Sequence, residues 1–125
     1  MTYKPAGYTS VAPYLTVNGA QATIDFLVAV FGADPLRIQR RDDKIQHGEV
    51  RIDDTVVMLT DAVDGWPAVA SNVHVYVKDV DATFTRAIAH GAISVQEPVK
   101  KDDADKRGGF RDNGGTTWWV GQLME

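Results

Sequence analysis

The sequence repeats one order of predicted elements at an interval of about 60 residues. Each half begins with a short segment of alternating apolar and polar residues, continues with an amphipathic stretch that a glycine ends, and closes with three strand-like segments. Leu15 matches Val75 at an offset of 60, and Gly32 matches Gly91 at an offset of 59. Single matches of this kind arise by chance, but an ordered match of whole elements predicts two copies of one module.

The first half predicts a strand, a helix and three more strands. Its opening segment VAPYLTV (11–17) alternates as strands do, and Asn18 can cap the following helix together with Gln21. The apolar positions of that helix have helical spacing and are Ile24, Leu27, Val28 and Phe31. The strand-like segments PLRIQRR, IQHGEVRID and TVVMLTD follow, with Asp53 and Asp54 suited to a tight hairpin turn before the last one.

The second half follows the same plan after the connector AVDGWPAVAS (62–71), whose proline and glycine are typical of a linker. The segment NVHVYVKD (72–79) alternates strictly, and Asp79 can cap the next helix. The apolar positions of this helix are Val80, Phe84, Ala87 and Ile88. Strands are predicted at SVQEPV, GGFRD and TTWWVGQLM. The glycines of GGFRDNGG are expected to make a tight turn, and KKDDADKR (100–107) a solvated loop.

These elements predict the α+β class, with two βαβββ modules at about residues 11–62 and 71–124. A single module of this size would bury the apolar face of its sheet poorly. We therefore expect the modules, related by pseudo-twofold symmetry, to form one domain over residues 1–125 or to pair across a homodimer.

Composition excludes several classes of function. The net charge of −4 and the pI near 5.2 argue against nucleic acid or an anionic membrane as a partner. The absence of cysteine excludes disulfides, thiolate catalysis and cysteine-ligated metal sites. The first residues contain no apolar run long enough for a signal peptide or a membrane span, so a cytoplasmic protein is expected.

Several stretches resemble the vicinal oxygen chelate superfamily, which holds glyoxalases, extradiol dioxygenases and bleomycin-resistance proteins, and in particular its PhnB-like branch. They are PYLTV, FLVAVFGAD, HGEVRIDDTVVMLTD, VHVYVKDVDATF and GGFRDNGG. The resemblance runs from about residue 11 to residue 123. It implies a curled mixed sheet that encloses a cleft, with the helices outside.

Alternation assigns the strand side chains either to a helix-facing core or to the cleft. The predicted core residues are Leu15, Val17, Val57, Leu59, Val73, Val75, Val77, Trp118 and Val120. The predicted cleft residues are Ala12, Tyr14, Thr16, Val56, Met58, Thr60, Asn72, His74, Tyr76, Thr117, Trp119 and Gly121. The neighbouring residues Trp118 and Trp119 are thereby separated, because Trp118 packs in the core whereas Trp119 faces the cleft.

Metal-using members of the superfamily carry one metal ligand on the first strand and one on the fourth strand of each module. The resemblance places these positions at Ala12, Met58, Asn72 and Trp119. Alanine and tryptophan do not ligate such an ion, methionine is too soft for it, and an asparagine carbonyl alone is weak. The usual metal site is therefore predicted to be absent, and no cofactor is expected.

A displaced site remains an alternative. His47 and Glu49 share one face of their strand if Val50 and Ile52 face the core. Together with His74 they could form a metal site of two histidines and a carboxylate, or His47 or Glu49 could act as a general base. The simpler interpretation is that both histidines are hydrogen-bonded cleft residues.

The predicted cleft has aromatic and apolar walls with a few polar groups, which is typical of a small-molecule pocket. The candidate ligand-binding residues are Tyr14, Arg37, His47, Glu49, Met58, Trp66, Asn72, His74, Tyr76 and Trp119. The superfamily includes antibiotic-binding proteins without a metal, so the resemblance implies a non-catalytic homodimer that sequesters a small aromatic molecule, such as a bleomycin-type peptide antibiotic. The alternatives are a lyase, isomerase or dioxygenase of the same superfamily, and a structural or regulatory domain without a ligand.

Overall fold

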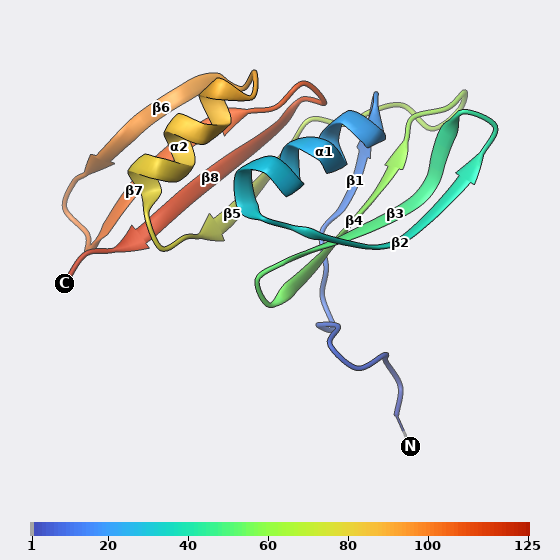
Figure 1. Ribbon diagram of the computed structural model, residues 1–125, viewed down its shortest axis with the longest axis horizontal. Coiled ribbons are helices and arrows are strands. Elements are labelled where there is room, and N and C mark those ends of the chain that lie inside the picture. The colour runs from blue at the N-terminus through green and yellow to red at the C-terminus, as the bar shows by residue number, and fades with distance from the viewer. Residues whose placement is uncertain (1) are drawn as a thin grey trace. The chain divides into compact units, whose positions relative to one another are not determined.

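The computed structural model describes residues 2–125, which form two compact units. The first unit extends to Val69 and the second runs from Ala70 to Glu125. Each unit is a βαβββ module with one helix and a four-stranded mixed sheet (Figure 1). The predicted α+β class and the two modules are therefore confirmed.

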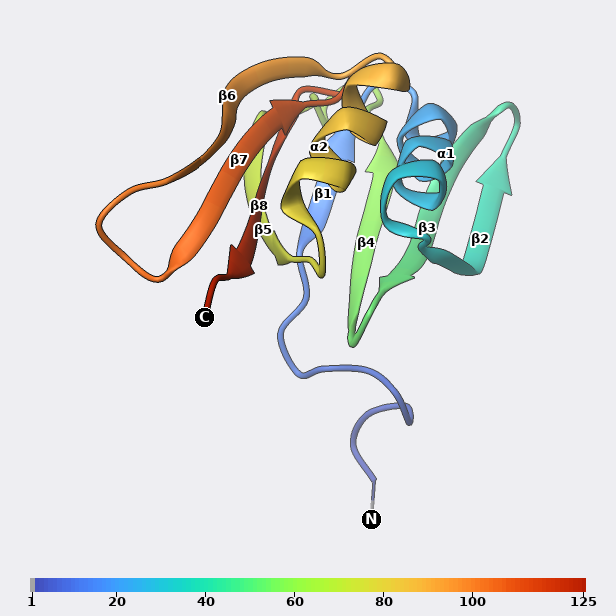
Figure 2. The ribbon, with the colours of Figure 1, turned by 60° about the vertical axis from the view of Figure 1, so that its left-hand side comes forward.

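The first unit consists of β1 (Tyr14–Val17), α1 (Ala20–Phe31), β2 (Asp34–Arg41), β3 (Lys44–Ile52) and β4 (Thr55–Asp61). Its strands have the order β1-β4-β3-β2, with β1 parallel to β4 and the other pairs antiparallel. The hairpin between β3 and β4 turns at Asp53 and Asp54 as predicted, and Asp53 adopts a positive φ of 54°. Helix α1 packs on β3 (Figure 2).

The second unit consists of β5 (Ser71–Tyr76), α2 (Val80–Ala89), β6 (Ile93–Lys100), β7 (Asp105–Arg111) and β8 (Thr116–Leu123). Its strand order is β5-β8-β7-β6, and β5 is parallel to β8, so the topology of the first unit recurs. Figure 2 shows α2 against this sheet, where it packs mainly on β7.

The cores of the units follow the predicted alternation closely. Leu15, Val17, Val57, Leu59, Trp118 and Val120 are all buried, as predicted. Val73, Val75 and Val77 alternate with exposed neighbours as expected but are only half-buried. The apolar face predicted for each helix includes a residue that is not buried. Val28 of α1 and Ile88 of α2 are each 39% exposed. These two residues occupy the same position of the repeat.

The predicted cap of α1 is wrong. Gly19, not Asn18, is the N-cap residue, and it adopts a positive φ of 78° without a side-chain hydrogen bond of its own. The carboxylate of Asp61 at the end of β4 takes the place of a local cap, since its Oδ1 accepts from the backbone N–H of Gly19 at 3.0 Å and of Ala20 at 2.8 Å. Its Oδ2 accepts from the N–H of Ile45 at 2.8 Å. Asp61 thus ties α1, β3 and β4 together.

Helix α2 of the second unit begins at its predicted N-cap. It also has a weaker form of the remote cap, by which we mean a hydrogen bond from the last strand of the module to the first N–H groups of the helix. Asp79 accepts a hydrogen bond from the N–H of Ala82, as expected of an N-cap. Gln122 of β8, which corresponds to Asp61 in the repeat, accepts one hydrogen bond from the N–H of Val80 at 2.9 Å. The remote cap is therefore a property of the module, with three bonds in one copy and one in the other.

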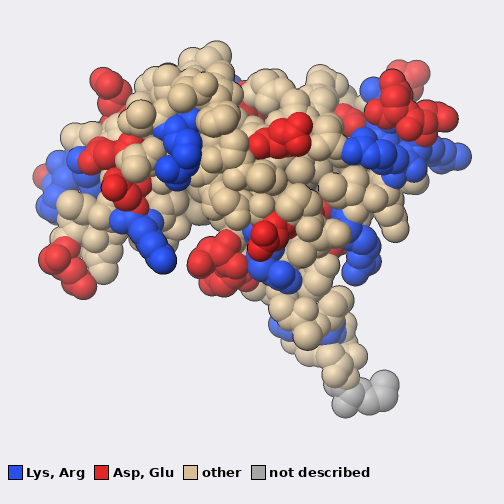
Figure 3. All heavy atoms as spheres, viewed as in Figure 1, with Lys and Arg blue, Asp and Glu red and all other residues tan. Residues whose placement is uncertain are grey.

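The predicted loop at residues 100–107 is too long. Strand β6 runs to Lys100 and β7 begins at Asp105, so only residues 101–104 join them. The charges in this segment have partners in the second unit, since Lys106 contacts Asp81 of α2 at 2.7 Å and Arg107 contacts Asp105 of β7 at 3.0 Å. The charged residues 105–107 therefore begin a strand, where they are half-buried and paired, and do not belong to a loop. On the face drawn in Figure 3, basic and acidic side chains are interspersed.

Within residues 2–125, no helix is both long enough and apolar enough to cross a membrane.

Candidate functional site

Trp119 lies on an exposed face of the second sheet, seated on a glycine. It is the register partner of His74 on β5 and of Gly109 on β7. Its indole N–H donates to the side-chain oxygen of Asn72 at 3.0 Å. A Cβ added at Gly109 would lie 2.6 Å from two ring carbons of Trp119, so the indole rests directly on the β7 backbone. The ring is therefore fixed by one hydrogen bond and one glycine, and it stays partly exposed.

Trp118 points the other way and is fully buried. Its indole N–H donates to Oδ2 of Asp112 at 2.9 Å, while Oδ1 of Asp112 accepts from the N–H groups of Gly114 and Thr116. The turn before β8 thus supplies the acceptor that a buried indole needs. The predicted separation of the two tryptophans is confirmed.

His74 and Tyr76 continue the face on which Trp119 lies. Their rings meet edge to face with centroids 4.7 Å apart, and the Tyr76 hydroxyl donates to Asp105 at 2.7 Å. A Cβ at Gly121 would lie 3.0 Å from Nε2 of His74, so a second glycine makes room for a ring. Burial, followed by the charge of Arg107, lowers the pKa of His74 against the opposing effect of Asp105, which favours the neutral imidazole.

In the first unit a chain of hydrogen bonds crosses the corresponding face of the sheet. The Tyr14 hydroxyl lies 3.4 Å from Nδ1 of His47, and Nε2 of His47 lies 2.8 Å from Oε2 of Glu49. The other oxygen of Glu49 accepts from the hydroxyl of Tyr8 at 2.5 Å. Met58 is the register partner of both Tyr14 and Glu49, so it lies between them in the sheet.

Glu49 is a buried carboxylate, with only 3% of its surface exposed. Burial raises its pKa, but the hydrogen bonds from Tyr8 and His47 and the charge of Arg37 outweigh burial and hold the pKa of Glu49 below its ordinary value. The same hydrogen bond raises the pKa of the Tyr8 hydroxyl. Glu49 is therefore ionised at neutral pH, and Arg37 acts on it through its charge.

The lowered pKa of Glu49 predicts an acid-dependent loss of stability. The native state binds fewer protons at this site than the unfolded state does, so the contribution is present above the ordinary glutamate pKa of about 4.3 and is lost as pH falls through the lower native value. We expect the free energy of unfolding of the wild type to fall more steeply between pH 5 and about 3 than that of Glu49→Gln. Urea titrations across this range measure the difference. Glu97→Gln, at an exposed carboxylate of β6, is the control and should keep the wild-type slope.

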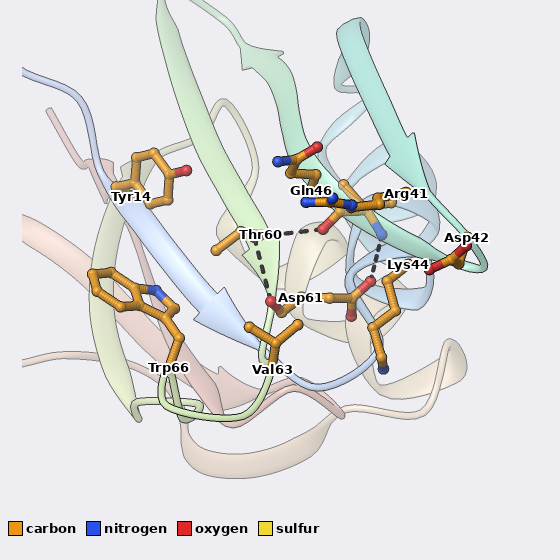
Figure 4. A pocket seen from close by; sticks show the side chains of 10 residues that line it. Tyr14, Arg41, Asp42, Lys44, Gln46, Thr60, Asp61, Val63 and Trp66 are labelled. Carbon is orange, nitrogen blue, oxygen red and sulfur yellow. Dashed lines mark hydrogen bonds between the residues drawn. The ribbon is translucent and has the colours of Figure 1, made fainter.

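A pocket of about 360 Å³ opens beside Tyr14 in the first unit (Figure 4). Its lining residues are Tyr14, Arg41, Asp42, Lys44, Ile45, Gln46, Thr60, Asp61, Val63 and Trp66. The indole N–H of Trp66 donates to Oγ1 of Thr16 at 3.2 Å, which holds this connector residue against the pocket. In Figure 4 the two aromatic rings stand on one side of the pocket, and Arg41 and Lys44 stand on the other.

A model of the Glyoxalase/Bleomycin resistance protein/Dioxygenase superfamily matches residues 7–120. The chain belongs to this superfamily. An uncharacterized protein of Mycobacterium bovis, Mb0911c, is 34% identical over 90% of this chain and 82% of its own length. The protein Rv0887c of Mycobacterium tuberculosis, also uncharacterized, is 34% identical over 90% of this chain and 74% of its own length.

Solved structures with a similar fold include TioX and TnmS3. TioX from Micromonospora sp. ML1 is similar with a TM-score of 0.79 and 25% identity, over 93% of this chain and 99% of that one. TnmS3 from Streptomyces sp. CB03234, an antibiotic-binding protein, is similar with a TM-score of 0.71 and 21% identity, over 98% of each chain. Membership of the PhnB-like branch stays a prediction.

The resemblance predicts the usual metal-ligand positions at Ala12, Met58, Asn72 and Trp119. In the register, Met58 lies across from Tyr14 and Trp119 lies across from His74. Nowhere in residues 2–125 do three histidine, aspartate or glutamate side chains come together as a metal site. His47 and Glu49 contact each other, whereas His74 contacts Tyr76 in the second unit. A displaced site formed by His47, Glu49 and His74 would take residues from both units, so this alternative stays a prediction.

The structure groups the sequence-predicted residues into three sets. The first sheet carries Tyr14, Arg37, His47, Glu49 and Met58. The pocket is lined by Tyr14 and Trp66. The second sheet carries Asn72, His74, Tyr76 and Trp119.

Sequence reasoning missed Tyr8, which precedes every predicted element, and the seating role of Gly109. The glycines of GGFRDNGG were expected to make a turn, but Gly108 and Gly109 lie inside β7. A strand glycine often marks the close approach of another group, so the pair was a usable signal.

Proposed function

We propose that this protein is a metal-independent binding protein that sequesters a small aromatic molecule, a peptide antibiotic of the bleomycin type, in a cleft of a homodimer. The observation that carries the proposal is the way in which the Trp119 ring is held on the sheet. One face of the indole is covered by the backbone at Gly109, its N–H is engaged by Asn72, and the side chain remains partly exposed. A rigid ring of this kind stacks on a planar ligand without first losing rotational freedom.

Two further features support binding of an aromatic molecule. The pocket of the first unit, about 360 Å³, falls within the size range of small-molecule sites and is walled by Tyr14 and Trp66. Among similar folds, TnmS3 is an antibiotic-binding protein. A metal is not part of the proposal, because the residues at the superfamily's usual ligand positions, Met58 and Trp119 among them, do not suit a hard divalent ion.

Isothermal titration with metal-free bleomycin in the presence of a chelator tests the proposal. We expect the wild type to bind, and Trp119→Ala to lose affinity by about tenfold or more, as removal of a central aromatic contact does. Ile88→Ala, an apolar truncation on the exposed side of α2, is the control and should bind as the wild type does.

An absence of binding by the wild type, or binding that needs an added metal, would contradict the proposal. Light scattering on the same samples checks the homodimer, and a monomer at ligand saturation would overturn that part.

A further inference from the structure

The residues that precede β1 contact the first sheet without belonging to it. Residues 3–12 form no helix or strand, and Figure 1 shows them as a plain chain that leads into β1. Most of them are exposed. Within the segment, the N–H of Tyr8 donates to the carbonyl of Pro5 at 3.3 Å, and Nζ of Lys4 donates to Ser10 at 2.8 Å. We call residues 3–12 the strap.

Side-chain hydrogen bonds hold the strap to the sheet. The hydroxyl of Tyr8 donates to Oε1 of Glu49 at 2.5 Å, and the guanidinium of Arg51 donates to the carbonyl of Gly7 at 3.3 Å. An exposed segment that adds no strand to the sheet opens at a small fraction of the free energy of global unfolding. The strap can therefore leave the sheet while the strands β1 to β4 stay paired.

Glu49, which the strap contacts, differs from the other buried carboxylates. Asp61 and Asp112 accept hydrogen bonds from backbone N–H groups of their own units, at a helix start and at a turn. Glu49 accepts from the side chains of His47, on the same strand, and of Tyr8, on the strap. When the strap leaves, Oε1 of a buried carboxylate loses its donor, which costs free energy unless another donor takes its place.

The repeat shows what is unusual about this position. Glu49 corresponds to Gly109, and their register partners Met58 and Trp119 correspond as well. In the second unit the indole of Trp119, which belongs to the sheet itself, packs on Gly109. In the first unit the sheet has a methionine and a carboxylate at these two positions, and the aromatic side chain that reaches the carboxylate is Tyr8 of the strap. The first sheet thus receives from outside an aromatic group that the second sheet supplies itself.

A phenol is the chemical group that matches this position. Tyr8 presents an aromatic ring with one hydroxyl donor, and a phenolic ligand presents the same two features. Its hydroxyl would make a charge-assisted hydrogen bond with Glu49, and the charge of Arg37 acts on both groups of the present pair. An aromatic ring without a hydroxyl would leave the carboxylate of Glu49 without a donor, and sites built to bond a hydroxyl discriminate strongly against such analogues.

We propose that the strap is a built-in competitor that occupies a phenol-binding site at Glu49 of the first sheet. A phenolic ligand takes the place of Tyr8 on Oε1 of Glu49, and residues 3–12 leave the sheet as it binds. The affinity for such a ligand is then reduced to the fraction of molecules in which the strap is open. The inference goes beyond the proposed function, because the site lies in the first unit and does not depend on Trp119.

Titration with N-acetyl-L-tyrosinamide, followed by NMR of the isotope-labelled protein, tests this proposal. We expect N-acetyl-L-phenylalaninamide, which lacks only the hydroxyl, to bind the wild type about tenfold more weakly or less. Tyr8→Phe removes the competing hydroxyl and should bind N-acetyl-L-tyrosinamide about tenfold more tightly, the usual value of a hydrogen bond to a charged group. Tyr3→Phe, the same change at an exposed residue of the strap, is the control and should bind as the wild type does.

Backbone motion of the strap separates displacement of Tyr8 from binding elsewhere. The heteronuclear NOE of the amides of Gly7, Thr9 and Ser10 reports fast motion of the strap. In the wild type these values should fall as N-acetyl-L-tyrosinamide saturates the protein, and in Tyr8→Phe they should be lower from the outset. Glu49→Gln should remove the preference for N-acetyl-L-tyrosinamide and leave the affinities for the two probes nearly equal.

Equal affinity of the wild type and Tyr8→Phe for N-acetyl-L-tyrosinamide would overturn the proposal, and so would binding that leaves the amides of the strap unchanged. Tyr8 precedes every helix and strand, so Tyr8→Phe is expected to fold normally. Failure of N-acetyl-L-tyrosinamide to bind, together with normal bleomycin binding, would overturn this inference and leave the proposed function intact. Displacement of the strap without bleomycin binding would support this inference and contradict the proposed function.

Discussion

Replacing Asp61 with alanine is expected to lower the free energy of unfolding by about 3 kcal/mol or more. Three backbone N–H groups, those of Gly19, Ala20 and Ile45, would lose a charged acceptor at once. Asp61 is buried, so water replaces these bonds poorly and the donors are left unsatisfied. Chemical denaturation followed by circular dichroism measures the loss.

The repeat supplies a matched control for this experiment. Gln122 occupies the corresponding position and accepts one hydrogen bond, from the N–H of Val80. Gln122→Ala should therefore cost only about 1 kcal/mol. Asp61→Asn should behave like Asp61→Ala, because one end of the amide becomes a donor that faces another donor. A loss at Asp61→Ala no larger than that at Gln122→Ala would show that the remote cap contributes little.

The two modules could be predicted because their signals are local. Alternation separates Trp118 from Trp119, and glycine stops and hairpin residues mark the ends of elements. Each of these patterns is carried by neighbouring residues, so the sequence alone contains it. The β3 pair of His47 and Glu49 was found in the same way, since residues two apart on a strand share a face.

The cap of α1 and the contact between Tyr8 and Glu49 could not be predicted, because they depend on residues far apart in the chain. The N–H groups at the start of α1 needed an acceptor, but nothing local identified Asp61, which is 41 residues from Ala20. Tyr8 lies 41 residues from Glu49, in a segment without periodicity. Val28 and Ile88 have the helical spacing of core residues but are each 39% exposed, and periodicity does not report which residues of an apolar face have a packing partner.

Alanine at Gly109 is expected to remove the proposed aromatic binding although every tryptophan remains. The added Cβ would lie 2.6 Å from Cε3 and Cζ3 of Trp119, closer than atoms approach, so the ring must leave its seat or β7 must shift. Overpacking of this kind typically costs about 1–3 kcal/mol of stability. The hydrogen bond to Asn72 is also lost once the indole moves. We therefore expect Gly109→Ala to weaken bleomycin binding as strongly as Trp119→Ala does, about tenfold or more.

Gly108→Ala is the matched control, since it adds the same methyl group one residue earlier on the same strand. Its Cβ would meet Pro98 at 3.2 Å and does not approach Trp119. Moderate destabilisation with unchanged binding is expected, and calorimetry together with denaturation separates the two effects. Wild-type affinity in Gly109→Ala, alongside lost affinity in Trp119→Ala, would mean that Trp119 binds the ligand without being packed on Gly109. The comparison thus distinguishes a ring that is held in place for its ligand from one that is merely present.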